Sequence, residues 1–147
     1  MEVVVKLRRT RPGAGPLPAY ATAGAAGLDL YANLERELML APMERVALGT
    51  GIALEIAAGF EGQVRPRSGR AIVDGFTLIN APGTIDADYR GEVMVLAINL
   101  GTRPVTIRPG DRIAQLVIAP VARATLVEVE SLSESERGGH GFGHTGR

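Results

Sequence analysis

The segment 80–93 gathers the side chains of this chain that are best suited to chemistry. It reads N-A-P-G-T-I-D-A-D-Y-R-G-E-V and places Asp86, Asp88, Tyr89 and Arg90 within five positions. A hairpin that only has to reverse direction needs no more than a pair such as Asn-Gly or Asp-Gly. The additional acid and aromatic ring therefore indicate a site, although a polar surface turn with solvated carboxylates is the alternative interpretation.

A second polar cluster, R-P-R-S-G-R at residues 65–70, lies between an expected strand and an expected helical turn. Backbone N–H groups at a helix start, a hydroxyl and several guanidinium groups together suit an anion of phosphate size. Ser68 is also a candidate N-cap of that turn. A charged turn with an ordinary capping serine is the alternative interpretation.

Two polar residues interrupt apolar strands, Asp29 after G-A-A-G-L and Gln115 within the run I-A-Q-L-V-I. The small residues before Asp29 would let the backbone approach a ligand, but a single Asp on a strand is usually a surface residue. A buried amide needs partners, so Gln115 either bonds to backbone or faces a ligand. No His/Glu cluster has zinc spacing. A bound metal would fit better as a hard cation held by substrate phosphates, and magnesium is the usual one.

The composition changes at residue 131, which divides the chain into an expected β-domain (1–130) and a flexible glycine-rich tail (131–147). The tail contains G-G-H-G-F-G-H-T-G but lacks the Lys-Ser/Thr ending of a P-loop. Phe142 has no apolar neighbours to pack against, so its ring could stack on a ligand while Arg137 grips an anion. We therefore expect the tail to close over a bound ligand; plain disorder is the alternative.

The positioning elements are almost all strands. Short β-rich runs recur between turn signals every eight to twelve residues or so, the spacing of a sandwich or barrel. Only residues 68–74 look helical, and 76–80 with 93–99 should form a hairpin whose bend carries Asp86. The strand candidates are 2–7, 28–32, 37–40, 43–48, 52–57, 60–65, 76–80, 93–99, 102–107, 113–119 and 125–129. The expected fold class is all-β with at most one short helix.

The composition excludes several classes of protein. Sixteen basic and sixteen acidic side chains give a formal net charge of zero, so no global field attracts nucleic acid or an anionic membrane. The absence of cysteine excludes disulfides and zinc–cysteine sites. The N-terminus lacks the apolar core of a signal peptide and no apolar run reaches membrane-spanning length. We expect a cytoplasmic protein that binds neither nucleic acid nor membrane.

Five ordered segments of the chain resemble the motifs of the deoxyuridine triphosphatase (dUTPase) family, and the likeness spans nearly the whole chain. They read A-G-L-D-L-Y-A (26–32), R-P-R-S-G-R-A (65–71), G-T-I-D-A-D-Y-R-G-E (83–92), G-D-R-I-A-Q-L-V-I (110–118) and R-G-G-H-G-F-G-H-T-G (137–146). The resemblance implies a distorted jelly-roll-like fold and a homotrimer whose active sites are each built by three subunits. It also implies hydrolysis of dUTP to dUMP and pyrophosphate with Mg²⁺.

The resemblance also implies roles for individual residues. Asp86 would activate the attacking water, and Tyr89 would lie under the deoxyribose and leave no room for a 2′-hydroxyl. Asp29 would act on the metal through water. The residues expected to bind substrate are Arg67, Ser68, Gly69 and Gln115 at the phosphates, Asn80 and the backbone near Met94 at the uracil, Thr84 in the hairpin motif, and Arg137 and Phe142 from the tail.

The tail departs from the family pattern R-G-x-G-G-F-G-S-T-G at two positions. His140 replaces a glycine and His144 replaces the serine, where it could add a titratable donor to the terminal phosphate. Two other functions stay open at this point. A dCTP deaminase of the same superfamily would have similar scaffold motifs but would release ammonia, and a non-catalytic trimer would bind nucleotide without turnover.

Overall fold

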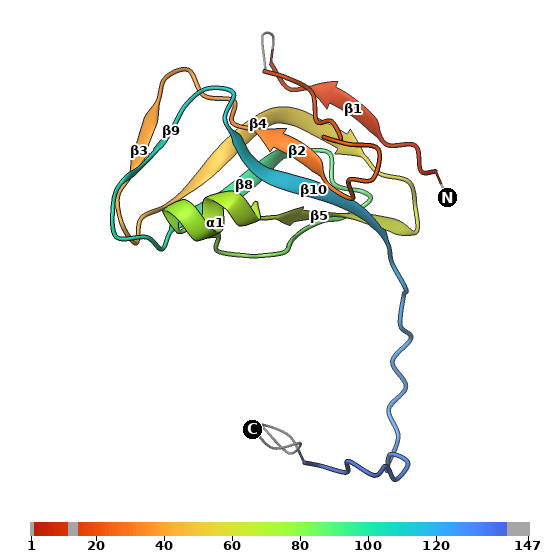
Figure 1. Ribbon diagram of the computed structural model, residues 1–147. Coiled ribbons are helices and arrows are strands. Elements are labelled where there is room, and N and C mark those ends of the chain that lie inside the picture. The colour runs from red at the N-terminus through yellow and green to blue at the C-terminus, as the bar shows by residue number, and fades with distance from the viewer. Residues whose placement is uncertain (1, 12–14, 141–147) are drawn as a thin grey trace.

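The computed structural model describes residues 2–11 and 15–140 (Figure 1). Within them the chain forms short strands and one helix. The elements are β1 (Lys6–Arg9), β2 (Leu28–Tyr31), β3 (Leu38–Leu40), β4 (Arg45–Glu55), β5 (Phe60–Arg65), α1 (Ser68–Asp74), β6 (Phe76–Leu78), β7 (Gly83–Ile85), β8 (Glu92–Asn99), β9 (Val105–Ile107) and β10 (Arg112–Pro120). The predicted all-β class with one short helix is confirmed.

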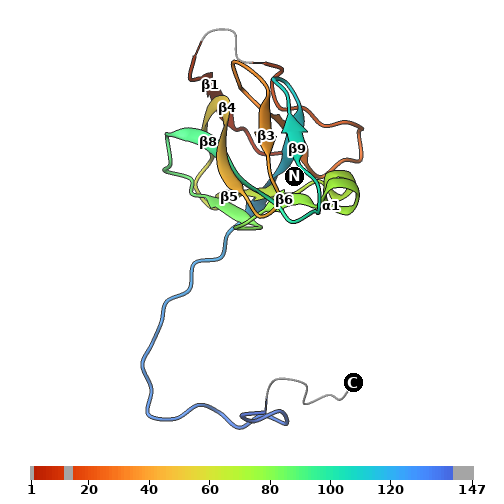
Figure 2. The same cartoon turned by 90° about the vertical axis from the view of Figure 1, so that its left-hand side faces the viewer.

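The strands form two four-stranded sheets and a two-stranded ribbon, with every pairing antiparallel. The sheet orders are β1-β4-β8-β6 and β2-β10-β5-β7, and β3 pairs with β9. Figure 2 shows the strands packed as one body from which the C-terminal segment departs. Neighbours in each sheet are distant in sequence, as in a jelly-roll-like fold.

One hydrophobic core lies between the sheets, and strand alternation builds it. Along β8, Val93, Val95 and Ala97 are buried while Met94 and Leu96 are more exposed. The same core receives Leu30 from β2 and Leu116 from β10. Successive strand residues point to opposite faces, so each strand has one core-facing row and one outward row.

Strand β4 is longer than the sequence predicts. Residues 43–48 and 52–57 are predicted as separate strands, but a single strand spans Arg45–Glu55. The predicted separator, Gly49-Thr50-Gly51, is instead a bulge, because the β4–β8 register shifts between Gly49 and Ala53. Gly51 has a positive φ of 73°, a conformation that glycine adopts at little cost.

The predicted pairing of the two hairpin strands is confirmed, but the segment that joins them is not the predicted simple bend. Strands β6 and β8 pair as expected, with Leu78 opposite Ala97. The connection between them is not a simple bend, because β7 crosses to the other sheet and pairs with β5. Ile85 of β7 is buried. Residues 86–91 therefore connect β7 in one sheet to β8 in the other.

Helix α1 occupies Ser68–Asp74 as predicted, but the predicted cap is wrong. Arg67 is the N-cap residue, in an extended conformation, and no side-chain hydrogen bond caps the helix. The Ser68 side chain therefore has no capping role. Gly75 ends the helix with a φ of 70°, and its N–H donates to the Ala71 and Arg70 carbonyls.

Residues 121–140 extend away from the body without forming a strand (Figures 1 and 2). The predicted strand at 125–129 is wrong for the single chain, since no neighbouring strand lies beside it to accept and donate hydrogen bonds. Leu126 is 93% exposed and Leu132 is 87% exposed. The described residues contain no helix that is long and apolar enough to cross a membrane.

Candidate functional site

The segment 80–96 forms a cavity of about 220 Å³, here called the hairpin pocket. Its lining combines core-facing and outward residues of β5, β7, β8 and the connection between them: Val64, Asn80, Gly83, Thr84, Ile85, Asp86, Tyr89, Glu92, Val93, Met94 and Leu96. Five predicted site residues, Asn80, Thr84, Asp86, Tyr89 and Met94, therefore lie together around one cavity.

Hydrogen bonds within the connection fix the orientation of Tyr89. Its N–H donates to the Asp86 carbonyl at 3.1 Å, and its hydroxyl donates to the Glu92 carbonyl at 3.1 Å. Gly91 leaves room for the ring, since a Cβ there would overlap the Tyr89 side chain. The Arg90 guanidinium donates to the Ala87 carbonyl at 2.7 Å and the Tyr89 carbonyl at 3.0 Å, so Arg90 stabilises the loop.

The Asp86 carboxylate faces solvent at the end of β7. It forms no hydrogen bond or ion pair with the other described residues, which leaves both oxygens available to water or ligand. Asp88, two residues later, is also exposed but does not line the hairpin pocket. The structure thus separates the two carboxylates that are close together in the sequence.

A larger cavity of about 650 Å³, here called the strand–helix pocket, lies between α1 and the β2–β10–β5 surface. It is lined by Ala21, Ala25, Ala26, Gly27, Asp29, Arg65, Arg67, Ser68, Gly69, Arg70, Val73, Asp74, Arg112, Gln115 and Val117. Asp29, Arg67, Ser68, Gly69 and Gln115, which the sequence predicts at phosphate or metal, are all members of this group.

Cross-strand register places three polar side chains of this pocket in one row. Gln115 of β10 lies opposite Asp29 of β2 on one side and Arg65 of β5 on the other. Residues directly opposite on antiparallel strands share a face. Positions 29, 65 and 115, far apart in sequence, therefore form a continuous polar strip on the outer face of the sheet.

Asp29 is held between two arginines. Its Oδ1 lies 3.1 Å from Arg67 Nε and its Oδ2 lies 3.2 Å from Arg112 Nη1, and the Asp29 side chain is only 13% exposed. Arg67 is the residue that enters α1, so this ion pair fixes the helix start against β2. Arg112 has no assigned role in the sequence predictions, because only the register beside Tyr31 brings it to this pocket.

The sequence leaves open whether Gln115 bonds to backbone or faces a ligand, and in the structure it bonds to backbone at the edge of a pocket. Its Nε2 donates to the Pro66 carbonyl at 3.0 Å, and the residue also lines the strand–helix pocket. Gly27 permits this close packing, because a Cβ there would lie 2.7 Å from Gln115 Oε1. The amide thus bonds to the turn before Ser68 and stays beside the pocket.

Arg70 joins the helix to its surroundings. Its guanidinium carbon lies 4.6 Å from the centre of the Phe76 ring. Arg70 Nε lies 3.0 Å from Asp74 Oδ2 and Nη1 lies 3.8 Å from Asp111 Oδ2. The first pair is close without the alignment of a hydrogen bond. The Asp111 contact joins α1 to the β9–β10 turn, the cation over the Phe76 ring joins it to β6, and the Asp74 pair lies within the helix.

The side chains of the strand–helix pocket fit a metal ion that is held by a bound phosphate and by water rather than by direct bonds to the protein. The described residues contain no group of three or more His, Asp or Glu side chains that could hold a metal ion. Both Asp29 oxygens are already paired with arginines. A magnesium ion that keeps most of its waters and binds phosphate oxygens suits these residues.

The described tail residues, 131–140, lie apart from both pockets. Arg137 Nε donates to the His140 carbonyl at 3.0 Å in a local turn of the extended segment. Phe142 and His144 are outside the described residues. Their predicted contacts with the ligand, and that of Arg137, stay predictions, as does the division of the chain at residue 130.

The two pockets share no lining residue. The hairpin pocket lies where β7 and β8 meet and includes Val64 of β5, whereas the strand–helix pocket lies over β2, β10 and the Arg65 end of β5. The structure therefore brings the predicted residues into two groups within one chain and does not bring the groups together.

Comparisons with known proteins identify the family of this chain. The dUTPase family profile matches residues 14–146. A deoxyuridine 5'-triphosphate nucleotidohydrolase of Anaeromyxobacter sp. is 59% identical over 149 residues and covers 100% of both chains. One of Caldanaerobacter subterraneus subsp. tengcongensis is 53% identical over 147 residues and covers 99% of both. A mutant of the Staphylococcus bacteriophage 80alpha dUTPase with dUpNHpp superposes with a TM-score of 0.88 at 25% identity, covering 98% of this chain and 99% of that chain.

These findings favour neither a deaminase nor a non-catalytic trimer. The profile covers all five motifs of the sequence and the curated relatives match over their full length. The predicted hydrolase activity is confirmed at the level of the family. The chain belongs to the dUTPase family.

Proposed function

We propose that this dUTPase hydrolyses its substrate at a site made of the hairpin pocket of one subunit and the strand–helix pocket of another. The observation that supports this proposal is that the two residue groups line separate cavities, which share no residue. Base, sugar and phosphates of one nucleotide are contiguous, so a complete site needs both groups side by side. A second subunit can supply that arrangement.

In this proposal the hairpin pocket binds the nucleoside and activates water. Asp86 takes a proton from the water that cleaves the α–β phosphoanhydride bond of dUTP, which releases dUMP and pyrophosphate. Its unpaired, exposed carboxylate supports that role, since a general base needs access to water. The Tyr89 ring lies under the deoxyribose, and Asn80 and the backbone near Met94 contact the uracil edge.

The strand–helix pocket binds the triphosphate. Arg67, Ser68, Gly69 and Gln115 supply donors, and Arg67 offers two adjacent N–H groups that match phosphate oxygens. Bound with the phosphates, Mg²⁺ supplies positive charge that neutralises the triphosphate. Asp29, whose carboxylate is held in place by Arg67 and Arg112, is the residue that would hold that ion, through water.

The C-terminal segment supports association into a homotrimer. Residues 121–132 leave the body with Val121, Leu126, Val127, Val129 and Leu132 all exposed. The chain also has an open apolar groove of about 520 Å³ beside β1, lined by residues such as Val5, Leu28, Phe60 and Ile118. Strand β1 ends its sheet, and an edge strand beside an apolar groove can accept a strand from another subunit. The segment is then well placed to carry the tail to a neighbouring site.

The reaction is tested by product analysis against a panel of nucleoside triphosphates. We expect dUMP and pyrophosphate from dUTP in the presence of Mg²⁺, little turnover of UTP, and no ammonia from dCTP. A profile without preference for dUTP would contradict the substrate assignment.

The shared site is tested by exchanging subunits between two inactive variants, Asp86→Asn and a truncation before Gly138. If hairpin and tail come from different subunits, some mixed trimers hold an intact Asp86 beside an intact tail, and activity returns. If each chain builds its own site, every site retains one lesion.

Each variant exchanged with itself is the control and should stay inactive. Native mass spectrometry identifies the mixed trimers. Mixed trimers without recovered activity would overturn the shared-site proposal while leaving the substrate assignment intact.

A further inference from the structure

The bulge in β4 pairs with the β8 residues that line the hairpin pocket. Gly49 pairs with Met94 and Ala53 pairs with Glu92, so Thr50, Gly51 and Ile52 together lie opposite Val93 alone. A bulge disrupts the regular ladder and leaves main-chain groups that need other partners. Glu92, Val93 and Met94 of β8 all line the hairpin pocket, so the bulge lies directly opposite the strand residues that form part of that cavity's wall.

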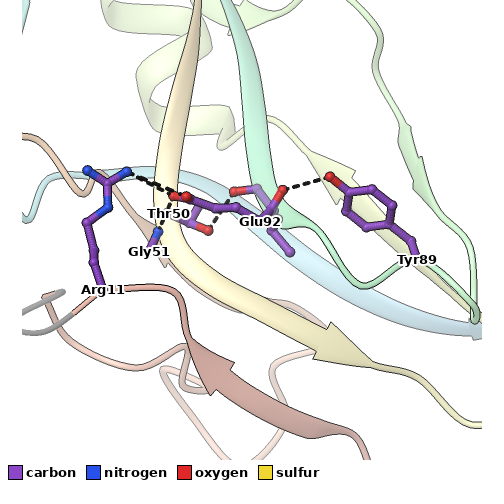
Figure 3. A network of polar contacts seen from close by, with 6 residues as sticks. Arg11, Thr50, Gly51, Tyr89 and Glu92 are labelled. Carbon is purple, nitrogen blue, oxygen red and sulfur yellow. Dashed lines mark hydrogen bonds and ion pairs between the residues drawn. The ribbon is translucent and has the colours of Figure 1, made fainter.

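Two side chains supply those partners (Figure 3). Glu92 Oε1 accepts the Gly51 N–H at 2.8 Å, and Thr50 Oγ1 donates to the Val93 carbonyl at 2.6 Å. Arg11 Nη2 lies 3.4 Å from the same Glu92 oxygen. Gly49 leaves room for the carboxylate, because a Cβ there would lie 2.7 Å from Glu92 Oε1.

The backbone of Glu92 holds the other end of this network. Its carbonyl accepts the Tyr89 hydroxyl at 3.1 Å, so one residue bonds to the bulge by its side chain and to Tyr89 by its main chain. Figure 3 shows Arg11 on one side of Glu92 and Tyr89 on the other, with Thr50 and Gly51 of β4 next to Glu92. Tyr89 makes no other side-chain hydrogen bond with the described residues. The direction of its ring therefore depends on where the Glu92 carbonyl lies.

We propose that Glu92 and Thr50, which close the β4 bulge, are positioning residues that set the Tyr89 ring and thereby the preference for deoxyribose over ribose. This rests on the proposed role of Tyr89 at the sugar. When the bulge is closed, the Glu92 carbonyl is fixed and the ring leaves no space for a 2′-hydroxyl. When it is open, the ring gains freedom and admits the ribonucleotide.

The first test measures the bulge directly and does not depend on activity. In Glu92→Ala the Gly51 amide loses its acceptor, so its hydrogen exchange should become faster while exchange in the β5–β10 pairing stays unchanged. Glu92→Gln retains an acceptor oxygen and should preserve the protection of Gly51. Unchanged exchange of Gly51 in Glu92→Ala would overturn the proposal.

The second test measures the ratio of kcat/KM for dUTP to that for UTP. We expect Glu92→Ala to lower this ratio by about 3- to 10-fold, the scale of one net hydrogen bond, mainly through better use of UTP. Glu92→Gln should restore the ratio. Arg11→Ala is the matched control, because it removes the ion pair and leaves the Gly51 bond; the ratio should stay unchanged.

A double-mutant cycle separates positioning from general destabilisation. Tyr89→Phe keeps the ring but removes the hydroxyl that bonds to Glu92. If Glu92 acts through Tyr89, then Glu92→Ala lowers the ratio much less in the Tyr89→Phe background. Fully additive effects, or an unchanged ratio in Glu92→Ala, would overturn the proposal.

Thr50→Val provides the test if Glu92→Ala does not fold. The substitution keeps the shape of the side chain and removes the hydroxyl that bonds to the Val93 carbonyl. It must lower the ratio as well, and an unchanged ratio would overturn the proposal. A wild-type enzyme without preference for dUTP over UTP would instead contradict the role of Tyr89, while Gly51 exchange still reports on the bulge.

Discussion

The hairpin pocket and the strand–helix pocket carry opposite charge. Among the described residues that line the hairpin pocket, Asp86 and Glu92 are the only ones of the types Asp, Glu, Lys, Arg or His, and both are acidic. The strand–helix pocket is lined by four arginines (65, 67, 70 and 112) and two aspartates (29 and 74), an excess of two positive charges. One pocket repels a triphosphate and the other attracts it.

The two pockets are also held in different ways. Hydrogen bonds that each have a main-chain partner fix the hairpin pocket and leave the Asp86 carboxylate open to water, whereas side chains paired with one another fix the strand–helix pocket around Asp29. The first arrangement suits proton transfer and shape recognition, and the second suits an anionic ligand. Neither pocket alone matches a whole nucleoside triphosphate, which is the physical reason to expect one subunit to face another.

The largest expected effect breaks the chemistry of the hairpin pocket. Asp86→Asn keeps the shape of the side chain but removes the proton acceptor, and we expect turnover to fall by at least ~100-fold, the scale of a positioned general base. Nucleotide binding, measured by calorimetry, should change little. Asp88→Asn is the matched control, because Asp88 is exposed nearby and does not line the pocket. Near-normal turnover in Asp86→Asn would remove Asp86 from the mechanism.

A smaller effect should follow from changing the strand–helix pocket. Arg67→Lys retains the charge but loses the paired N–H groups, so we expect KM for dUTP to rise by about tenfold, the scale of one strong charge-assisted bond, with a smaller change in kcat. Arg112 still pairs with Asp29, so the thermal midpoint should stay close to wild type. The exposed Arg36→Lys should have no effect. A fall in kcat with unchanged KM would contradict the division of roles between the pockets.

The third prediction concerns recognition of the sugar. Tyr89→Ala removes the ring from the hairpin pocket and should bring the kcat/KM values for dUTP and UTP closer together, by about tenfold if the ring supplies a full van der Waals barrier. Tyr89→Phe keeps that ring and should have a smaller effect. Equal discrimination before and after Tyr89→Ala would place sugar selection at another residue.

Local sequence patterns predict most of the fold. The β-rich runs at residues 60–65, 93–99 and 113–119 predict strands that the structure confirms, and the run 68–74 predicts the helix. The exceptions are segments whose conformation depends on pairing with a strand that is distant in sequence. Gly49-Thr50-Gly51 looks like a turn because the pairing of β4 with β8 cannot be seen locally. Residues 125–129 have strand character but pair with no strand among residues 2–11 and 15–140.

The site residues can be found by sequence, but their spatial grouping cannot. Asp29, Arg67 and Gln115 are singled out by residue type and by resemblance, and cross-strand register then places them in one pocket. Arg112 and Glu92 give no such signal. Arg112 follows an ordinary turn, and Glu92 is one charge at a strand start, so their contacts with Asp29 and Gly51 arise only from the tertiary fold.

The smallest expected effect comes from an ion pair that belongs to neither pocket. Lys6 Nζ lies 2.8 Å from Glu55 Oε1 on the exposed β1–β4 edge. The hydrogen bond from Lys6, then its charge, and more weakly the charge of Arg90 lower the pKa of Glu55 below its ordinary value of 4.5, against a small opposing effect of desolvation. A carboxylate with a lowered pKa contributes stability above its unfolded pKa and loses it as pH falls through the folded pKa.

Glu55→Gln should therefore lower the thermal midpoint slightly at pH 7 and not at all once the pH is well below 4.5. The shift should also shrink with added salt, because solvent and ions screen exposed pairs. Thermal unfolding of both proteins from pH 3 to 7 measures it, with dUTP turnover at pH 7 as the control that should not change. A larger shift at low pH than at neutral pH would contradict the assigned sign.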